Sequence, residues 1–430
     1  MNNSKVGFVG MSHLGLNYAV ATAKKNFKVI CCDQDEKIIN SLNKKKSPIF
    51  EKGLEENIKS ISHNLKFSND FSELRSCTVV YISKDVETKK TGESDLRSVK
   101  KLIKKTIKFL NKNANLIILC QVPPGFCRKI DWPKDQLYYQ VETLIFGQAL
   151  DRALNPERLI VGSSFKNTKI KKPYLQLLKS FKCPLIQMNY ESAELAKISI
   201  NMYLISTVTT TNVISEVCER VGGDWKDISA SLRLDKRIGK YAYLNPGLGI
   251  SGGNLERDLY TLNKLQVSNK LNNKFVAELK NKSTARKMWI VDILKKINKH
   301  LKFKKIAILG LAYKVDTHSI KNSPAIELIK RLANYEIRVF DPVVKKVNFG
   351  SQKVTICSNA KDAIKGCDIL IVATPWPSFR YISLSFIEKN TKHKILVDPY
   401  NLYNTKKLSI KKINYISMGT KNNIGENEIK

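Results

Sequence analysis

The sequence has no long apolar run and comparatively few acidic residues. Its 430 residues contain no apolar stretch that approaches the roughly 18 to 20 residues needed to span a bilayer. The first ten residues lack the apolar core of a secretory leader. We therefore expect no membrane span, no membrane partner and a cytoplasmic location.

The shortage of acid gives a strongly basic chain. The 38 acidic and 74 basic residues leave a formal net charge of +36, but the lysines are spread along the whole chain. Nucleic-acid sites usually cluster basic residues on one face, often with interleaved aromatic residues. Because neither pattern is present, we expect no specific nucleic-acid partner, and DNA binding is a distant alternative. A phosphate-bearing small molecule suits the charge better.

Cysteine spacing indicates neither disulfides nor a metal site. The nine cysteines are an odd number without the spacing of metal ligands. Cys31 and Cys32 lie in an apolar strand pattern, where thiols usually act as small core groups. We expect no bound metal.

The first third of the chain carries a dinucleotide-binding fingerprint. A strand pattern at 5–9 precedes Gly10, Ser12 and Gly15, then comes a helical pattern, and a second strand pattern at 27–32 ends at Asp33. In this context the glycines allow a tight turn and close helix packing, and the acid binds the adenosine ribose, which favours NAD over NADP. Ser12 stands in place of the middle glycine of the fingerprint, and the turn can accommodate a side chain this small. An empty cleft is the alternative. We expect His13 to be an exposed turn residue.

Candidate reactive groups follow in the middle of the chain. Glu142 lies among apolar residues, so it is either an acid–base group with a raised pKa or merely a strand edge. A helical pattern over 191–221 puts Lys197 and Asn201 on one face, where they could hold a developing oxyanion. From spacing alone, a solvated lysine is the better interpretation of Lys197. Arg237 could meet a phosphate.

A glycine-rich stretch at 245–259 reads NPGLGISGGNLERDL. Glycine at this density lets a backbone approach a ligand closely. Taken alone, the stretch could equally be a flexible surface linker.

The last third repeats the strand–helix–strand pattern. Strand patterns at 304–309 and 336–340 flank a helical pattern at 324–332, and a single long helix is predicted over 283–299. A chain of this length exceeds one ordinary core. The predicted fold class is α/β, with two Rossmann-like doubly wound domains joined by a helical domain and a long connecting helix. The predicted divisions are 1–188 (the Rossmann domain with the dinucleotide fingerprint, which binds NAD), 189–300 (helical), 301–420 (Rossmann-like) and 421–430 (a disordered tail).

These motifs together resemble the UDP-glucose/GDP-mannose 6-dehydrogenase family over nearly the full length. The ordered matches are Gly10 and Gly15 with Asp33, Ser47 to Glu51, Glu142 with Gly147 and Ala149, Pro156 to Arg158, Glu194 with Lys197 and Asn201, Arg237 to Gly239, Gly310 to Lys314, Ser323-Pro324 and Asp341-Pro342. The resemblance implies oxidation of a sugar C6 alcohol to a carboxylate with two NAD and no metal.

The resemblance also assigns residues. It implies a homodimer with 189–300 as the dimerising domain, and it makes 301–420 the nucleotide-sugar-binding domain. The UDP- or GDP-linked sugar would be bound by Arg237, Gly249, Gly252 and Lys314. The resemblance places Lys197, Asn201 and Asp258 near the reacting carbon, and Glu142 in the catalytic group.

The departures from the family pattern fall on the chemistry. Asn254 occupies the position of the catalytic cysteine, and no cysteine lies between Cys218 and Cys357. Arg257 replaces a lysine and Phe146 a glutamate. Further departures are Ser251 for a glycine, Gln121 for a threonine, and a missing Thr-Pro around 83–87.

The absence of the catalytic cysteine determines which reactions we expect. A thiolate captures an aldehyde as a covalent adduct that can be oxidised again, and an amide cannot. We therefore expect an NAD-dependent oxidoreductase that stops after one hydride transfer, oxidises through a hydrate, or returns the hydride for net isomerisation. The alternative is a catalytically silent protein that binds NAD and a nucleotide sugar.

Overall fold

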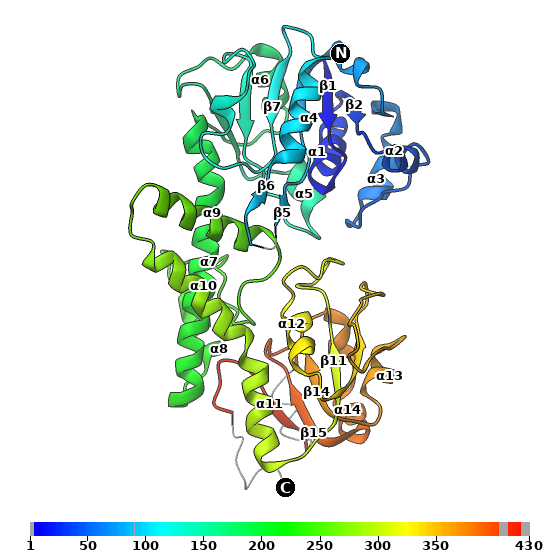
Figure 1. Ribbon diagram of the computed structural model, residues 1–430, viewed down its shortest axis with the longest axis vertical. Helices are drawn as coiled ribbons and strands as arrows, with labels where there is room; N and C mark the ends of the chain where they lie inside the picture. The colour runs from blue at the N-terminus through cyan, green and yellow to red at the C-terminus, as the bar shows by residue number, and fades with distance from the viewer. Residues whose placement is uncertain (1–3, 90, 404–411, 423–430) are drawn as a thin grey trace. The chain divides into compact units, whose positions relative to one another are not determined.

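A computed structural model describes residues 4–89, 91–403 and 412–422 of the chain (Figure 1). It divides into two compact units, Met1–Ile200 and Asn201–Lys430, which are described separately below. None of the helices in these residues is long and apolar enough to cross a membrane. The predicted α/β class is confirmed. The four-part division stays a prediction, and most of its expected tail, 423–430, lies outside the described residues.

The first unit is built on an eight-stranded sheet with the order β10-β9-β8-β7-β4-β1-β2-β3. The strands are β1 (Lys5–Val9), β2 (Lys28–Cys32), β3 (Leu65–Ser68), β4 (Cys77–Ile82), β7 (Asn115–Ile118), β8 (Leu137–Gln140), β9 (Leu159–Ser163) and β10 (Leu185–Asn189). Neighbours pair in parallel except β8 and β9, which are antiparallel. A two-stranded hairpin, β5 (Glu87–Thr88) and β6 (Ser94–Asp95), stands apart.

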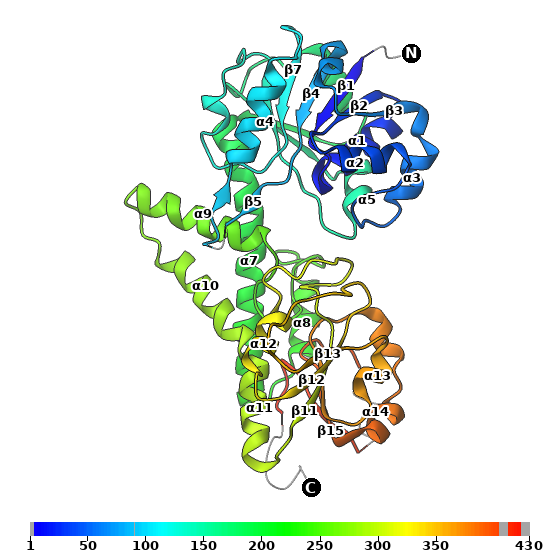
Figure 2. The same ribbon diagram turned by 45° about the vertical axis from the view of Figure 1, so that its right-hand side comes forward.

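Helices cover both faces of this sheet because its strands are apolar on both sides. Within β4, Val79 and Tyr81 pack into one core and Val80 and Ile82 into another. The first core is closed by α1 (His13–Lys24), α2 (Glu36–Asn43), α3 (Leu54–Ser60), α5 (Ala149–Leu154) and α6 (Lys172–Lys179). The second is closed by α4 (Arg97–Ile107) and the start of α7. Figure 2 shows α1, α2 and α3 grouped beside β1, β2 and β3. This is the predicted doubly wound arrangement.

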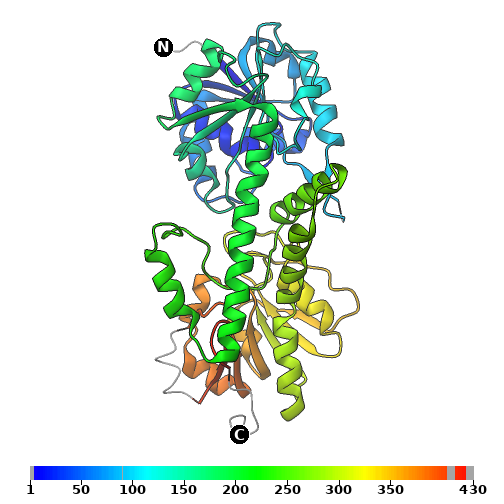
Figure 3. The same cartoon turned by 90° about the vertical axis from the view of Figure 1, so that its left-hand side faces the viewer.

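Helix α7 (Tyr190–Val221) is one unbroken helix of 32 residues (Figure 3). The helical pattern predicted it to within one residue. Lys197 and Asn201 therefore lie one turn apart on the same side of it.

The second unit contains a six-stranded parallel sheet with the order β13-β12-β11-β14-β15-β16. Its strands are β11 (Lys305–Leu309), β12 (Glu336–Phe340), β13 (Val354–Ile356), β14 (Cys367–Val372), β15 (Thr391–Val397) and β16 (Asn414–Ile416). Helices α12 (Pro324–Arg331), α13 (Ala360–Ile364) and α14 (Leu384–Asn390) pack on it around one apolar core. The second Rossmann-like domain is thus confirmed.

Four further helices of this unit are α8 (Trp225–Leu234), α9 (Asn254–Ser268), α10 (Lys274–Lys287) and α11 (Trp289–His300). Helices α9 and α10 form a hairpin that Figure 1 shows clearly. The prediction of one helix over 283–299 is wrong, because α10 ends and α11 begins at Met288, whose ψ is −9°. The apolar period continues through this break, so the sequence pattern does not reveal it.

Candidate active site

The turn after β1 has the geometry that the fingerprint predicts. Gly10 has φ of +98°, and its N–H donates to the Cys32 carbonyl at 2.9 Å. A Cβ on Gly15 would lie only 1.9 Å from the Gly10 carbonyl oxygen, so helix α1 can approach the turn only with glycine there. These residues form a cradle that a side chain would fill, which fits a dinucleotide pyrophosphate at the start of α1.

Ser12 fits the turn because its side chain forms hydrogen bonds with the segment that follows β4. Its φ is −79°, an ordinary value that does not require glycine. The hydroxyl donates to the Ser83 carbonyl at 3.1 Å and accepts from the Asp85 N–H at 2.9 Å. The missing middle glycine is therefore accommodated by bonding to the end of β4.

Asp33 supports the same turn. Its Oδ2 accepts from the Met11 N–H at 2.6 Å, and its Oδ1 accepts from the Asp35 N–H at 3.0 Å. The side chain is only half-buried. The carboxylate thus stabilises the turn, and its contact with a ribose stays a prediction.

The expectation of an exposed His13 is wrong. His13 is the first residue of α1 and is 9% exposed, with Nε2 2.7 Å from Glu51 Oε2. Its ring stacks on Phe146 with centroids 4.1 Å apart. Both partners are distant in sequence, so the local turn pattern did not reveal this contact.

Glu51 is a site residue that the sequence reasoning passed over. Its carboxylate also accepts from the N–H groups of Gly147 at 3.1 Å and Ala149 at 3.1 Å. Burial alone would raise the pKa of Glu51, but these bonds and the one from His13 outweigh burial and lower it below its usual value. Glu51 therefore joins the start of α1 to the segment that follows Glu142. Its place in the Ser47 to Glu51 motif was the available signal.

Glu142 and Lys197 form a buried ion pair in the first unit. Glu142 Oε1 lies 2.8 Å from Lys197 Nζ, with side chains 11% and 6% exposed. Glu142 follows the end of β8, and its Oε2 accepts from the Leu144 N–H at 2.9 Å. The expectation of a solvated Lys197 is wrong, because α7 buries that face against the sheet.

The glycine-rich stretch is a fixed loop of the second unit, so the linker interpretation is wrong. The Gly247 N–H donates to Asn212 Oδ1 at 2.9 Å, and the Ile250 N–H donates to Ser283 Oγ at 2.7 Å. Gly249 has φ of +72°, and a Cβ there would lie 2.4 Å from the Ser283 carbonyl oxygen.

The second half of the loop packs against the segment after β11. Gly252 has φ of +79°, and a Cβ there would lie 2.8 Å from the Tyr313 ring. Ser251 Oγ donates to the Tyr313 carbonyl at 3.3 Å, and Asn322 Nδ2 donates to the Gly252 carbonyl at 2.8 Å. Glycine is required at both positive-φ positions because backbone or ring atoms occupy the space of a side chain.

Helix α9 begins where the loop ends and carries two of the predicted site residues, Asn254 and Asp258. Asn254 is exposed at its first position, and its Oδ1 accepts from Arg257 Nη2 at 3.2 Å. Asp258 is 1% exposed and accepts a hydrogen bond from Asn201 Nδ2, itself 6% exposed. The structure therefore brings Asn201 and Asp258 together, and their role in the reaction stays a prediction.

The other two predicted substrate-binding residues, Arg237 and Lys314, are not fully buried. Arg237 has an 89% exposed side chain and pairs with Asp235 at 2.6 Å, two residues earlier. Lys314 is half-buried in the segment that carries Tyr313. Within residues 4–89, 91–403 and 412–422, no three histidine, cysteine or acidic side chains gather as metal ligands do.

Comparison with known proteins identifies the family. Three models of the UDP-glucose/GDP-mannose dehydrogenase family match in order: the NAD binding domain at 4–175, the central domain at 191–283 and the UDP binding domain at 307–405. The chain belongs to the UDP-glucose/GDP-mannose dehydrogenase family. It is an NAD-dependent oxidoreductase of the nucleotide-sugar dehydrogenase type.

Individual family members agree with this assignment. The chain is 30% identical over 437 residues to a UDP-glucose 6-dehydrogenase from Rickettsia prowazekii, covering 96% of this chain and 99% of that one. It is 28% identical to one from Bacillus subtilis, covering 96% and 93%.

Solved structures show the same fold. A UDP-glucose dehydrogenase from Pyrobaculum islandicum superposes with a TM-score of 0.83 at 22% identity, covering 96% of this chain and 97% of that one. A UDP-D-ManNAc dehydrogenase from Pyrococcus horikoshii gives 0.84 at 20% identity, covering 96% and 99%.

Proposed function

We propose that this chain oxidises the primary alcohol of a UDP-sugar to the aldehyde and goes no further by the cysteine route. The relatives named UDP-glucose 6-dehydrogenase and the match to a UDP binding domain support the substrate class. The observation that carries the proposal is Asn254 at the start of α9, where the resemblance places the catalytic cysteine.

The cofactor is held by the turn after β1. Gly10, Ser12 and Gly15 would hold the pyrophosphate, and Asp33 the ribose hydroxyls. NAD, when bound, takes up two electrons and one proton from the alcohol carbon. The second proton of the alcohol must leave from its oxygen, and this is the task of the chain's own groups.

We assign the transfer of this proton to two buried pairs, Asn201 with Asp258 and Glu142 with Lys197. Asp258 would accept it through a water, because its carboxylate already orients the Asn201 amide. Asn201 and Lys197 would stabilise the negative charge that develops on the oxygen. Glu142 would hold the Lys197 ammonium in place.

Asn254 blocks the second oxidation. To yield an acid, the aldehyde must first become a tetrahedral adduct, which a thiolate forms readily. The Asn254 amide is no nucleophile, and its oxygen is already bonded to Arg257. The chain has no cysteine between 218 and 357 that could replace it.

The nucleotide end would be held elsewhere in the second unit. We assign this task to Arg237, Gly249, Gly252 and Lys314. Gly249 and Gly252 set the path of the loop against Ser283 and Tyr313, and the two cations suit a diphosphate.

An exposed apolar face of α7 supports a homodimer. Tyr203, Ile214, Val217 and Val221 are exposed by 79%, 38%, 51% and 74%. Their spacing of eleven, three and four puts them on one side of α7. An exposed apolar stripe of this kind fits self-association, with 189–300 as the dimerising domain. The cytoplasm remains the location that we propose.

Incubation with NAD and a panel of UDP- and GDP-sugars tests the proposal. We expect NADH from at least one UDP-sugar, together with an aldehyde product identified by mass spectrometry. Binding of NAD and a UDP-sugar by calorimetry without any NADH would instead show a catalytically silent protein.

A further inference from the structure

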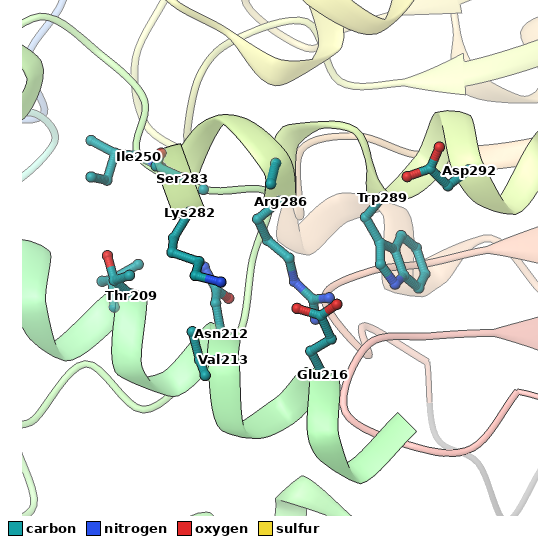
Figure 4. Close-up of a pocket in the computed structure, with 13 residues that line it drawn as sticks. Thr209, Asn212, Val213, Glu216, Ile250, Lys282, Ser283, Arg286, Trp289 and Asp292 are labelled. Atoms are coloured by element: carbon teal, nitrogen blue, oxygen red, sulfur yellow. The ribbon is translucent and has the colours of Figure 1, made fainter. Parts of the chain in front are cut away.

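A pocket of about 240 Å³ lies behind the glycine-rich loop in the second unit (Figure 4). Figure 4 shows that α7 and α10 form its two sides, with Ile250 of the loop at one end and Trp289 of α11 at the other. The volume is below the roughly 300 to 1,000 Å³ typical of pockets for drug-sized ligands, yet many times the ~10 to 15 Å³ that one water needs. A small metabolite fits such a space, and a nucleotide sugar does not.

The inner wall offers hydrogen-bond donors. Thr209, Asn212, Ser283 and Arg286 line the pocket and are each between 5% and 7% exposed. Within the described part of the chain, Thr209 Oγ1 and Arg286 Nε have no hydrogen-bond partner. Buried polar groups normally have one, so these two atoms require an explanation.

Asn212 and Ser283 point to the same ligand chemistry. Asn212 Oδ1 accepts from the Gly247 N–H, which leaves the amide hydrogens to donate. Ser283 Oγ accepts from the Ile250 N–H, which leaves its own hydrogen to donate. Four neighbouring donors favour a ligand group with several acceptor oxygens, such as a carboxylate.

The outer part of the pocket has the opposite character. Glu216, Lys282 and Asp292 are exposed charged residues of the lining there. Lys282 lies 3.8 Å from Glu278, and Arg286 inside lies 2.7 Å from Glu219, so both cations are partly neutralised. A purely anionic ligand therefore gains little at the mouth, whereas a positive group would be attracted to Glu216.

From this polarity we propose that the pocket is a site for a small zwitterion, an α-amino acid, with the carboxylate inward and the ammonium outward. Thr209, Asn212, Ser283 and Arg286 bind the carboxylate, and Glu216 binds the ammonium. The site shares only Gly249 with the residues that we assign to the substrate, and none with the groups that we assign to the proton and hydride transfer.

A ligand bound in the pocket would also restrain the glycine-rich loop. Asn212 and Ser283 bond directly to the loop backbone at Gly247 and Ile250, so a ligand on these side chains also fixes the loop. The loop leads to Asn254 at the start of α9. Binding is thus expected to slow amide hydrogen exchange at 247–252.

The test measures binding to the full-length chain without NAD or any nucleotide sugar, so it is independent of the proposed oxidation. A panel of the standard L-amino acids is screened by thermal shift, and calorimetry gives the affinity of the best one. L-alanine is then compared with propionate and ethylamine, which each lack one of the two charged groups. We expect saturable binding of at least one amino acid, and binding of the two fragments at least about tenfold weaker than that of L-alanine.

Variants locate the site. Thr209→Val removes a hydroxyl without a partner, so we expect about tenfold weaker binding with no loss of thermal stability. Asn212→Asp keeps the acceptor for the Gly247 N–H and loses the donors, with a similar loss of affinity. Asn272→Asp is the matched control, because it also keeps its acceptor for a backbone N–H, that of Lys274, away from the pocket.

Glu216→Gln separates the two ends of the ligand. It should weaken binding of the amino acid and leave propionate unchanged or tighter. The proposal is wrong if no amino acid binds, if propionate binds as well as L-alanine, or if Thr209→Val binds as the parent chain does.

Discussion

The Glu142 carboxylate lies 2.8 Å from the Lys197 ammonium, and both side chains are almost entirely out of water. Removing one partner leaves the other as an uncompensated buried charge. We therefore expect Lys197→Met to lower the free energy of unfolding in urea by about 3 to 5 kcal/mol. The double variant with Glu142→Gln should recover part of that loss.

The exposed pair Lys59 and Glu55 provides the control, with side chains 54% and 40% exposed. Lys59→Met should leave the urea midpoint unchanged, because water screens such pairs. Equal effects of Lys197→Met and Lys59→Met on the urea midpoint would show that Lys197 and Glu142 do not form a buried ion pair.

Gly15 is predicted to be intolerant of any side chain. Gly15→Ala would put a Cβ 1.9 Å from the Gly10 carbonyl oxygen, and the backbone of the turn must move. We expect a loss of about 3 kcal/mol or more in stability, together with at least about tenfold weaker NAD binding by calorimetry. Gly223→Ala is the matched control, since the nearest atom to its Cβ is 3.5 Å away. If Gly15→Ala binds NAD like Gly223→Ala, the turn is not the cofactor site.

The pH dependence of stability reports on Glu51. Its folded pKa is lowered, so it contributes stability above the unfolded value of about 4.3 and loses that contribution as pH falls through the folded pKa. Glu51→Gln should be less stable than the parent chain at pH 7, by roughly 2 kcal/mol for the lost charged hydrogen bonds. The difference should shrink below about pH 4.3. Urea unfolding at pH 7, 5 and 3.5 measures it, and a constant difference would refute the linkage.

Cofactor choice depends on Asp33. Its charge should repel the 2′-phosphate of NADP, so the parent chain should bind NAD at least about tenfold more tightly than NADP. Asp33→Asn keeps an acceptor for the Met11 N–H and removes the charge. We expect this variant to lose most of the preference in parallel calorimetric titrations. If Asp33→Asn still prefers NAD over NADP to the same degree, residues other than Asp33 set the preference.

Features encoded locally could be predicted from the sequence. Strand β1 at 5–9 and helix α7 follow from apolar periodicity, and the turn at Gly10 and Gly15 follows from glycine spacing before a helix. The break at Met288 was missed because two helices placed end to end share one apolar pattern.

Contacts between distant segments could not be predicted in the same way. His13 and Glu51 are 38 residues apart, and nothing in the turn sequence indicates that the segment before α3 contacts the histidine. Lys197 reads as solvated because the burial of its face of α7 depends on the strand that precedes Glu142. The chemical meaning of Asn254 came only from resemblance, since an asparagine in a glycine-rich loop has no distinctive pattern of its own.

The number of NADH molecules formed per UDP-sugar consumed tests the central claim most directly. The full-length chain is incubated with NAD and the best UDP-sugar, the NADH is quantified by absorbance, and the product is trapped with hydroxylamine and weighed by mass spectrometry. The Asn254→Cys variant is run in parallel to ask whether a thiol restores the second step. We predict one NADH and a trapped aldehyde for the parent chain. Two NADH and a uronate from the parent chain would contradict the account.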